Sequence, residues 1–363
     1  MVAAGVFGGG CGGSNVSTPE PSPTSPDGAT GTLQPPGPSD AATGTSDSPS
    51  GLDREQYYAI WGAGDADIWA FGVPIRGGGE GGLGGPEACK PDGGRTENVV
   101  RRFDGTSWSL VNFGAERLIL DAHGSASNDV WAVGMHGAVW RWNGQAWTPQ
   151  DISSAVPHDG SPCPEVSLHG VWARAHDDVW AVGYIYPSSE GPGLILHFDG
   201  AGWKRFPVDA RDGFLAVWAG ASNDAWATGA SGIAYHFDGT TWTRSWPTIN
   251  RYLYSVWGSG PSDVWAAGNG GALIHFDGQS WSHFPDAGTI GARGILTGRH
   301  SADVWAAFNM PFGFEDAGAP RLLHWDGGTW TPIALSSDRS IADLWSSESG
   351  QVWSAGTTLE RLR

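Results

Sequence analysis

Short stretches in which hydrophobic and polar residues alternate recur along most of the chain, separated by turn-forming residues. Residues 255–281 show the pattern clearly, because "SVWG" is followed by "DVWAAG", by "ALIHF" and by a stretch that opens at Trp281. Short alternating runs rich in valine, isoleucine and aromatic side chains are typical of half-buried β-strands. The pattern therefore predicts an all-β protein built from short strands.

These stretches form a repeat, in which Trp226 and Trp265 are 39 positions apart and Trp265 and Trp305 are 40 apart. Four short strands in a repeat of this length are typical of a β-propeller blade. We predict a seven-bladed β-propeller with four-stranded antiparallel blades, with six blades as the alternative. The last blade is expected to have three strands, or a weakly held fourth from about 46–52. The approximate blade bounds are 57–114, 118–152, 166–209, 214–249, 252–288, 292–335 and 340–363.

Most of the 22 tryptophans occupy fixed places in this repeat. Five close the first strands, seven lie in the second strands and six open the fourth strands. A bulky aromatic residue at fixed positions suits sheets that pack face to face about 10 Å apart, so we expect these side chains to pack between blades. The three groups are 61, 172, 218, 257 and 345; then 69, 131, 180, 226, 265, 305 and 353; then 108, 147, 203, 242, 281 and 330.

Asp-Gly or Asn-Gly precedes nearly every fourth strand, as in "HFDGQSW" at 275–281. Such a pair between alternating runs is a strong hairpin signal, and it predicts a type I′ turn with Asp277 and Gly278 at its centre. The aspartates before the second strands, such as Asp263, are expected to bond their own backbone two residues further on.

Four histidines fill the same slot of successive repeats: His197, His236, His275 and His324. Equivalent positions of neighbouring blades are roughly 10 Å or more apart, whereas zinc ligands converge at about 2 Å. We therefore expect no metal site and no cofactor, with structural calcium near "GDADIW" (64–69) as a lesser alternative.

The first 50 residues differ from the repeats, since they contain no lysine or arginine and are rich in proline, serine, threonine and glycine. Residues 1–11 resemble the end of a bacterial lipoprotein signal with Cys11 as the lipidated residue, and 12–50 are predicted to be a disordered tether before the propeller, 51–363. The expected location is the bacterial cell envelope, lipid-anchored, or outside the cell. The formal net charge of −18 argues against binding to nucleic acid or to an anionic membrane surface other than through the lipid.

The repeat is interrupted by four long loops, which connect second to third strands or one blade to the next. They are 73–97, 150–166, 184–193 and 308–320. In an antiparallel meander these connections emerge on one face, which should also hold Cys89 and Cys163 close enough for a disulfide. Variable loops on a rigid core often carry function. The predicted ligand-binding residues are Tyr184, Tyr186, Phe312, Phe314, Glu315 and Asp316.

Two propeller families share this repeat style. The "DGxxW" hairpins resemble shortened Asp-boxes of sialidase-like propellers, and "DVWAVG…HFDGxxW" is similar to tectonin-type repeats. The second resemblance implies carbohydrate binding. No binding residue carries over from it. The arginine triad and the Tyr/Glu pair of sialidases find no match here, so no catalytic residue carries over either.

These observations favour a monomeric, non-catalytic propeller on the cell surface that binds a glycan or a protein through its loop-decorated face. One alternative is an Asp-box-type glycoside hydrolase, which needs two carboxylates about 5–10 Å apart in a pocket. The other is a purely structural envelope protein without a ligand.

Overall fold

The structure, a computed structural model, describes residues 55–75, 97–115, 117–156, 166–185, 191–284, 293–309, 321–335 and 340–363. The chain divides into two units, 1–41 and 42–363, and all described residues belong to the second. None of the helices within the described ranges is long and apolar enough to cross a membrane.

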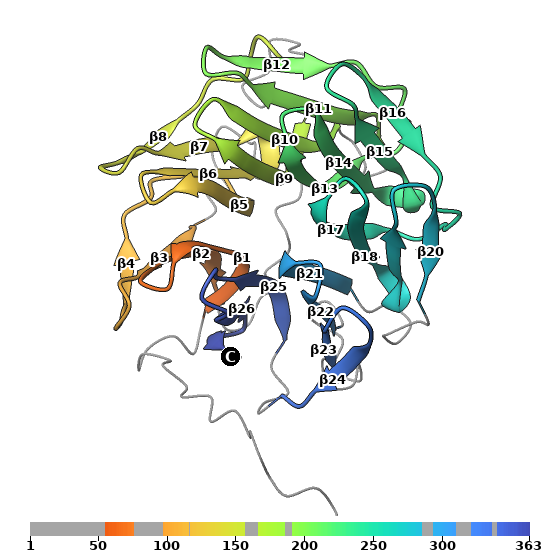
Figure 1. Cartoon of the computed structure of the whole chain (residues 1–363). Coiled ribbons are helices and arrows are strands. Elements are labelled where there is room, and N and C mark those ends of the chain that lie inside the picture. The colour runs from red at the N-terminus through yellow and green to blue at the C-terminus, as the bar shows by residue number, and fades with distance from the viewer. Residues whose placement is uncertain are drawn as a thin grey trace, which may run out of the picture. The chain divides into compact units, whose positions relative to one another are not determined.

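Seven antiparallel sheets surround a central axis, as predicted for a seven-bladed propeller (Figure 1). Six blades have four strands that pair in chain order. The first strands, nearest the axis, are β1 (Glu55–Gly64), β5 (Ile119–Ala126), β9 (Val166–Ala175), β13 (Phe214–Ala221), β17 (Leu253–Gly260), β21 (Arg293–His300) and β25 (Ile341–Ser346). The second strands are β2 (Asp67–Pro74), β6 (Asp129–Gly134), β10 (Asp178–Ile185), β14 (Asp224–Gly229), β18 (Asp263–Gly268), β22 (Asp303–Asn309) and β26 (Val352–Gly356).

The outer strands are shorter. The third strands are β3 (Val99–Phe103), β7 (Val139–Trp142), β11 (Gly193–Phe198), β15 (Ala234–Phe237), β19 (Leu273–Phe276), β23 (Arg321–Trp325) and β27 (Leu359–Arg361). The fourth strands are β4 (Trp108–Val111), β8 (Trp147–Pro149), β12 (Trp203–Phe206), β16 (Trp242–Ser245), β20 (Trp281–His283) and β24 (Trp330–Ile333). Single 3-10 turns, η2 (Met135–Gly137), η3 (Ala230–Gly232) and η4 (Asn269–Gly271), link second to third strands in three blades.

Blade seven has three strands in the described part of the chain, β25, β26 and β27. The stretch 46–52, considered above as a fourth strand, lies outside the described residues. Blade seven nevertheless contacts blade one directly, because the Ile60 N–H donates to Asp343 Oδ2 (2.9 Å) and Ser349 donates to Asp65 (2.6 Å).

The core between blades is a regular set of tryptophan pairs. The fourth-strand tryptophan of one blade meets the second-strand tryptophan of the preceding blade edge to face, with ring centroids 5.2–5.8 Å apart in six such pairs. An edge-to-face pair stabilises by about 0.5–1.5 kcal/mol beyond its buried area. The prediction that these side chains pack between blades is confirmed, and each second-strand tryptophan is at most 3% exposed.

The turns between third and fourth strands differ from the predicted type I′ geometry. Phe276 pairs with Trp281, so the loop holds four residues, and Gly278 (φ 94°) has positive φ whereas Asp277 does not. Asp277 precedes the central pair, and its Oδ1 accepts the N–H groups of Gln279 (2.9 Å) and Ser280 (2.8 Å). A glycine with positive φ at the first central position is the arrangement of a II′ turn.

Candidate functional site

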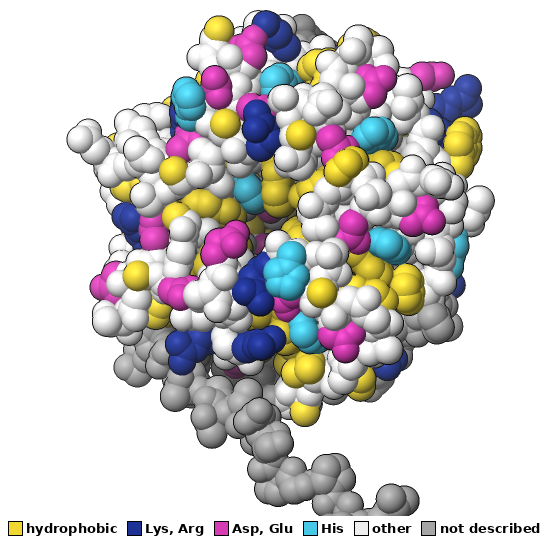
Figure 2. Space-filling model, viewed as in Figure 1, with side chains coloured by type: hydrophobic (Ala, Val, Ile, Leu, Met, Phe, Trp, Pro, Cys, Tyr) yellow, Lys and Arg dark blue, Asp and Glu magenta, His cyan; other side chains and the backbone are white. Residues whose placement is uncertain are grey.

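The seven first strands enclose a channel along the propeller axis with a volume of about 1030 Å³. Figure 2 shows one face of the propeller, with a hollow at its centre bordered by hydrophobic side chains. We call the channel end near the second-to-third-strand and blade-to-blade connections the loop-side mouth, and the opposite end the turn-side mouth. Since every blade contributes to its wall, the channel is the candidate site.

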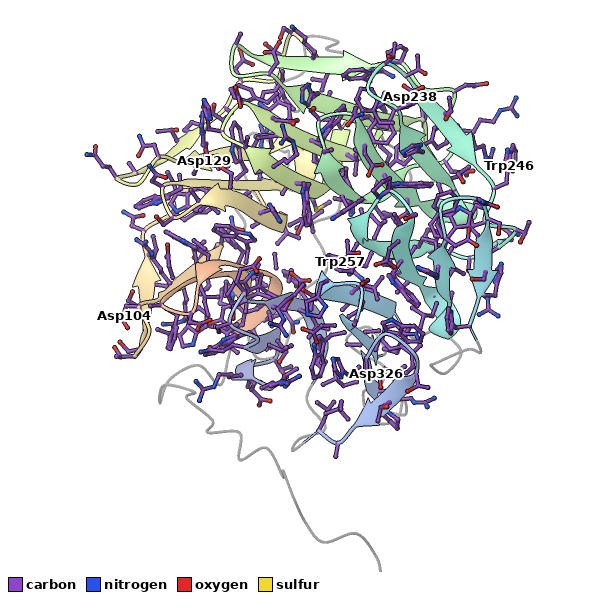
Figure 3. The ribbon with its side chains drawn as sticks, in the orientation of Figure 1. Asp104, Asp129, Asp238, Trp246, Trp257 and Asp326 are labelled. Atoms are coloured by element: carbon purple, nitrogen blue, oxygen red, sulfur yellow. The ribbon has the colours of Figure 1, made fainter. Side chains whose placement is uncertain are left out.

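Aromatic side chains form a collar near the turn-side mouth. Its members are the first-strand tryptophans 61, 172, 218, 257 and 345, joined by His123 and Thr297 at the equivalent positions of blades two and six. Figure 3 labels Trp257 beside the axis. Sequence analysis assigned these tryptophans to packing between blades alone, but they also border the channel.

Collar tryptophans lie against the first strand of the next blade, in the same direction around the axis. A Cβ added at Gly124 would lie 2.5 Å from the Trp61 ring, and one added at Gly62 would lie 2.7 Å from the Trp345 ring. Each of these indoles therefore lies over the glycine of the following blade, where a side chain would not fit. None of the five indole N–H groups donates a hydrogen bond to another residue in the described part of the chain.

Two carboxylates lie deeper in the channel and connect neighbouring blades. Asp121 accepts the N–H groups of Val171 (2.7 Å) and Ala122 (2.9 Å). Asp343 similarly accepts those of Ile60 (2.9 Å) and Leu344 (2.8 Å). Both carboxylates thus bond the first strand of the next blade, which satisfies backbone groups that face the channel.

Both of these carboxyl groups are partly buried in the channel wall. Burial raises the pKa of Asp121 to about 8, and the nearby Asp343 carboxylate adds to this increase. The hydrogen bonds that Asp121 accepts from Val171 and Ala122 lower its pKa and so oppose the increase. Burial also raises the pKa of Asp343 to about 7. Arg293 lowers both values, so it lies within electrostatic reach of both groups.

The two channel histidines are uncharged near neutral pH. Burial lowers the pKa of His123 and of His169 to about 3. The Ala173 N–H donates to His123 Nδ1 (3.2 Å), which requires an unprotonated nitrogen there. The imidazole of His123 also stacks on Trp172, with centroids 3.9 Å apart, so it takes the place of a tryptophan in the collar.

The loop-side mouth combines aromatic, apolar and cationic side chains from the seven first strands. They are Tyr58, Leu120, His169, Leu215, Tyr254, Arg293 and Ala342. The exposed Arg293 guanidinium lies over the Tyr254 ring, 5.0 Å from its centroid. Within the described residues it makes no ion pair and donates no hydrogen bond.

Of the six ligand-binding residues predicted from sequence, only Tyr184 lies in the described ranges. It is 9% exposed and stacks on His169 with ring centroids 5.0 Å apart, so it supports the channel wall rather than offering an open surface. The residues Tyr186, Phe312, Phe314, Glu315 and Asp316, the lipidation site Cys11 and the pair Cys89 and Cys163 lie outside the described residues.

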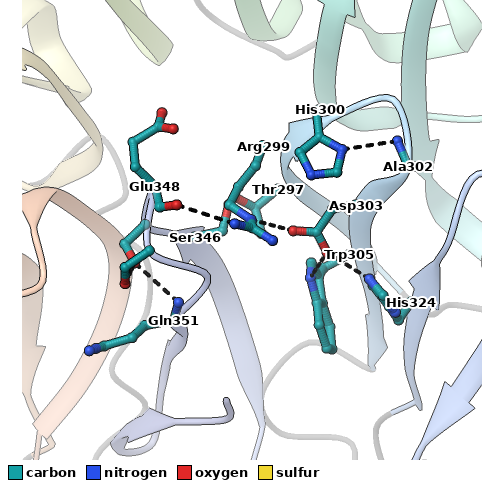
Figure 4. Close-up of polar contacts among 12 residues, drawn as sticks. Thr297, Arg299, His300, Ala302, Asp303, Trp305, His324, Ser346, Glu348 and Gln351 are labelled. Atoms are coloured by element: carbon teal, nitrogen blue, oxygen red, sulfur yellow. Dashed lines mark hydrogen bonds and ion pairs between the residues drawn. The ribbon is translucent and has the colours of Figure 1, made fainter.

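The repeated histidines and aspartates pair within each of blades three to six. His324 bonds Asp303 (2.6 Å) and stacks on Trp305 (4.3 Å), and the Trp305 N–H donates to the same carboxylate (3.1 Å), as Figure 4 shows. Arg102 and Arg141 take the histidine's place in blades one and two, pairing with Asp67 (2.6 Å) and Asp129 (2.7 Å).

The prediction that these aspartates bond their own backbone was therefore wrong, because they bond side chains of the same blade instead. In the described part of the chain, no group of three or more His, Cys, Asp or Glu could hold a metal ion.

The contact between blades six and seven differs from the other six. Thr297 replaces the collar tryptophan there and bonds Ser346 (3.1 Å), and Arg299 donates to the carbonyl of Glu348 (3.2 Å), as drawn in Figure 4. Since blade seven has no fourth strand among the described residues, Trp305 has no edge-to-face tryptophan partner from it. The Arg363 guanidinium lies over Trp305 instead, 5.9 Å from its centroid.

No protein-family model and no curated protein sequence matches the chain. Solved propellers match it in fold. "YCF48 bound to D1 peptide" is 16% identical, with a TM-score of 0.57 over 85% of this chain and 93% of that one. A streptogramin B lyase is 13% identical, with a TM-score of 0.62 over 86% of this chain and 95% of that one.

The extracellular domain of BT4673 from B. thetaiotaomicron is 11% identical, with a TM-score of 0.56 over 86% of this chain and 39% of that one. At these identities the likeness establishes the propeller fold alone. The likeness to tectonin-type and Asp-box propellers remains one of repeat style.

Sequence reasoning missed the channel residues, above all Arg293, Tyr254 and Tyr58. A usable signal was present, because Tyr58 and Tyr254 stand three positions before the first-strand tryptophans Trp61 and Trp257. Arg293 was harder to find, since blade six has Thr297 in place of that tryptophan.

Proposed function

We propose that the chain is a non-catalytic binding propeller that takes a glycan or a protein ligand at the loop-side mouth of its central channel. The observation that carries this proposal is the exposed Arg293 guanidinium, which has no ion pair among the described residues and stands beside Tyr254. Aromatic side chains next to a small number of directed polar groups are the usual lining of a ligand site. YCF48, a protein of similar fold, is bound to a D1 peptide, which supports a peptide or protein as the ligand class.

A binding role suits the two channel carboxylates better than acid–base chemistry does. Each already accepts two backbone N–H groups and thereby joins two blades. A general acid or base must reach the substrate's proton, and these oxygens are held by the protein instead. Attachment to the cell envelope through Cys11 is part of the same proposal, supported by the tether composition of 12–50.

The test is binding of the full chain to a glycan array and to envelope proteins in a pull-down. The Tyr58→Ala/Tyr254→Ala variant alters the loop-side mouth, and Leu110→Ala is the control, because Leu110 is 67% exposed on outer strand β4. We expect the double variant to lose at least about tenfold in affinity and the control to bind as wild type. Equal binding by all three proteins would remove the loop-side mouth as the site.

A further inference from the structure

The first strand of blade six departs from the repeat at successive channel positions. The other six first strands have a register shift two to four residues before the collar position, as between Leu253 and Ser255 in blade five, whereas β21 has no shift there. Without that shift Arg293, which pairs with Asn309, lines the channel and lies over Tyr254 of blade five. The charged side chain therefore enters the channel through a specific change in backbone register.

The position of Arg293 is fixed by close backbone packing behind it. A Cβ added at Gly294 would lie 2.7 Å from the Gly268 nitrogen and 2.8 Å from the Phe308 ring. A side chain at 294 would force β21 away from blade five, and Arg293 with it. The Arg293 backbone is thus fixed beside blade five, where the guanidinium lies over Tyr254.

The channel's own acids do not neutralise Arg293. Asp121 and Asp343 lie within its electrostatic reach, yet both give their oxygens to backbone N–H groups. A guanidinium has five N–H donors arranged to hold a carboxylate through two parallel bonds.

The neighbours of Arg293 at the mouth suit an apolar group. Leu120, Leu215 and Ala342 line the channel there, and Ile295 follows two positions after Arg293 on the same strand. The last residue of a peptide presents a carboxylate and a side chain together. An acidic sugar carries several hydroxyl groups, and Leu120, Leu215 and Ala342 offer them no hydrogen-bond partner.

We propose that Arg293 binds the C-terminal carboxylate of a peptide that ends in an apolar residue. This inference rests on the proposed function and names the ligand of that same site. The peptide end enters by the loop-side mouth, with its carboxylate paired to the guanidinium and its last side chain against the Leu120 and Leu215 side of the channel wall.

This binding is expected to depend on pH, because ionised Asp121 and Asp343 repel a carboxylate. Burial raises the pKa of these groups to about 8 and about 7, so they gain charge over the weakly alkaline range. His123 and His169 remain neutral there. The ionisable groups that line the channel are Tyr58, Asp65, Asp121, His123, His169, Tyr254, Arg293, Arg299, Asp343 and Glu348.

The test uses the full chain and an array of hexapeptides that end in Leu, Ile, Val or Phe, made once as free acids and once as C-terminal amides. We expect free acids to bind and amidation to weaken binding at least about tenfold, the scale of a lost charge-assisted pair. Arg293→Gln should cause the same loss for free acids and no further loss for amides. Arg293→Lys should keep part of the preference, and Arg205→Gln on the outer strand β12 should keep all of it.

The second arm measures affinity at about pH 6 and about pH 9. Wild type should bind free acids more weakly at the higher pH, and Asp121→Asn/Asp343→Asn should remove that difference. Amides that bind as tightly as acids, or an Arg293→Gln variant that still prefers acids, would overturn the proposal. So would oligogalacturonate that binds through Arg293 while peptides do not. Ligands that depend on Tyr58 and Tyr254 but not on Arg293 would leave the proposed function standing without this inference.

Discussion

Blades five and six are built alike on the outside and differently at the axis. Their second-strand tryptophans, Trp265 and Trp305, both donate to the aspartate two residues earlier and both stack on a histidine. At the axis, blade five has the collar tryptophan Trp257, and blade six has Thr297. The repeat is therefore retained where sheets pack on one another and varies where side chains face the channel. Each prediction below compares matched positions of these blades or separates packing from channel chemistry.

The largest effect is expected from the paired tryptophans. Trp265→Ala should lower the free energy of unfolding by about 3–5 kcal/mol, because a fully buried ring leaves a cavity. Trp305→Ala should cost about 1 kcal/mol less, since Trp265 meets Trp330 edge to face (5.2 Å) and Trp305 has no such tryptophan partner in the described chain. Urea unfolding of both variants measures the difference. Equal losses would show that the edge-to-face pairs contribute little.

Gly294→Ala should destabilise by about 2 kcal/mol, because the added methyl group meets backbone and a buried ring. Gly64→Ala is the matched control, since a Cβ there would have nothing within 4 Å. Thermal unfolding compares the two. If both variants unfold like wild type, β21 has room to move and the position of Arg293 is not fixed by packing.

The channel carboxylates should make the propeller less stable as pH rises. Their pKa values are raised on folding, so their contribution is fully present below the unfolded-state pKa of about 4 and is lost as pH rises through about 7 and about 8. The free energy of unfolding should fall by more than about 1.4 kcal/mol, the equivalent of one pKa unit. Denaturation at several pH values measures it.

The Asp121→Asn/Asp343→Asn variant should show a flatter profile over that range, whatever its overall stability. A profile as steep as that of wild type would assign the pH dependence to other groups.

The smallest effect is expected in the outer turns. Gly278→Ala and Gly327→Ala should each cost about 1 kcal/mol, because both glycines have positive φ (94° and 97°), which an L-residue adopts at a cost. The two losses should be equal, since the turns of blades five and six share one geometry. Unequal losses would extend the difference between these blades to their outer edge.

The fold could be predicted from sequence because the same order of strands and turns recurs in every repeat. A single strand such as 272–276 is ambiguous alone, but its recurrence with "DVWAAG" and Trp281 specified blade, order and neighbour packing. The turn type was mistaken because "Asp-Gly" was placed at the turn's centre. The Asp277 carboxylate, by accepting two N–H groups, takes the position before the centre instead.

The candidate site was less accessible to sequence reasoning for a physical reason. Whether a first-strand side chain faces the axis depends on a register shift, and the shift present in β17 is absent from β21. The sequence of 292–300, "ARGILTGRH", contains no pattern that predicts the missing register shift. The predicted ligand-binding residues were chosen from loops that interrupt the repeat. Arg293 was missed because it departs from the repeat inside a strand.

The contact between blades six and seven has a mechanical consequence. Elsewhere neighbouring blades are joined by paired indoles, whereas here an aliphatic cluster around Trp305 is supplemented by the polar pair Thr297–Ser346 and by Arg363. Because the edge-to-face tryptophan pair is missing among the described residues there, this contact between blades should be the first to loosen under strain.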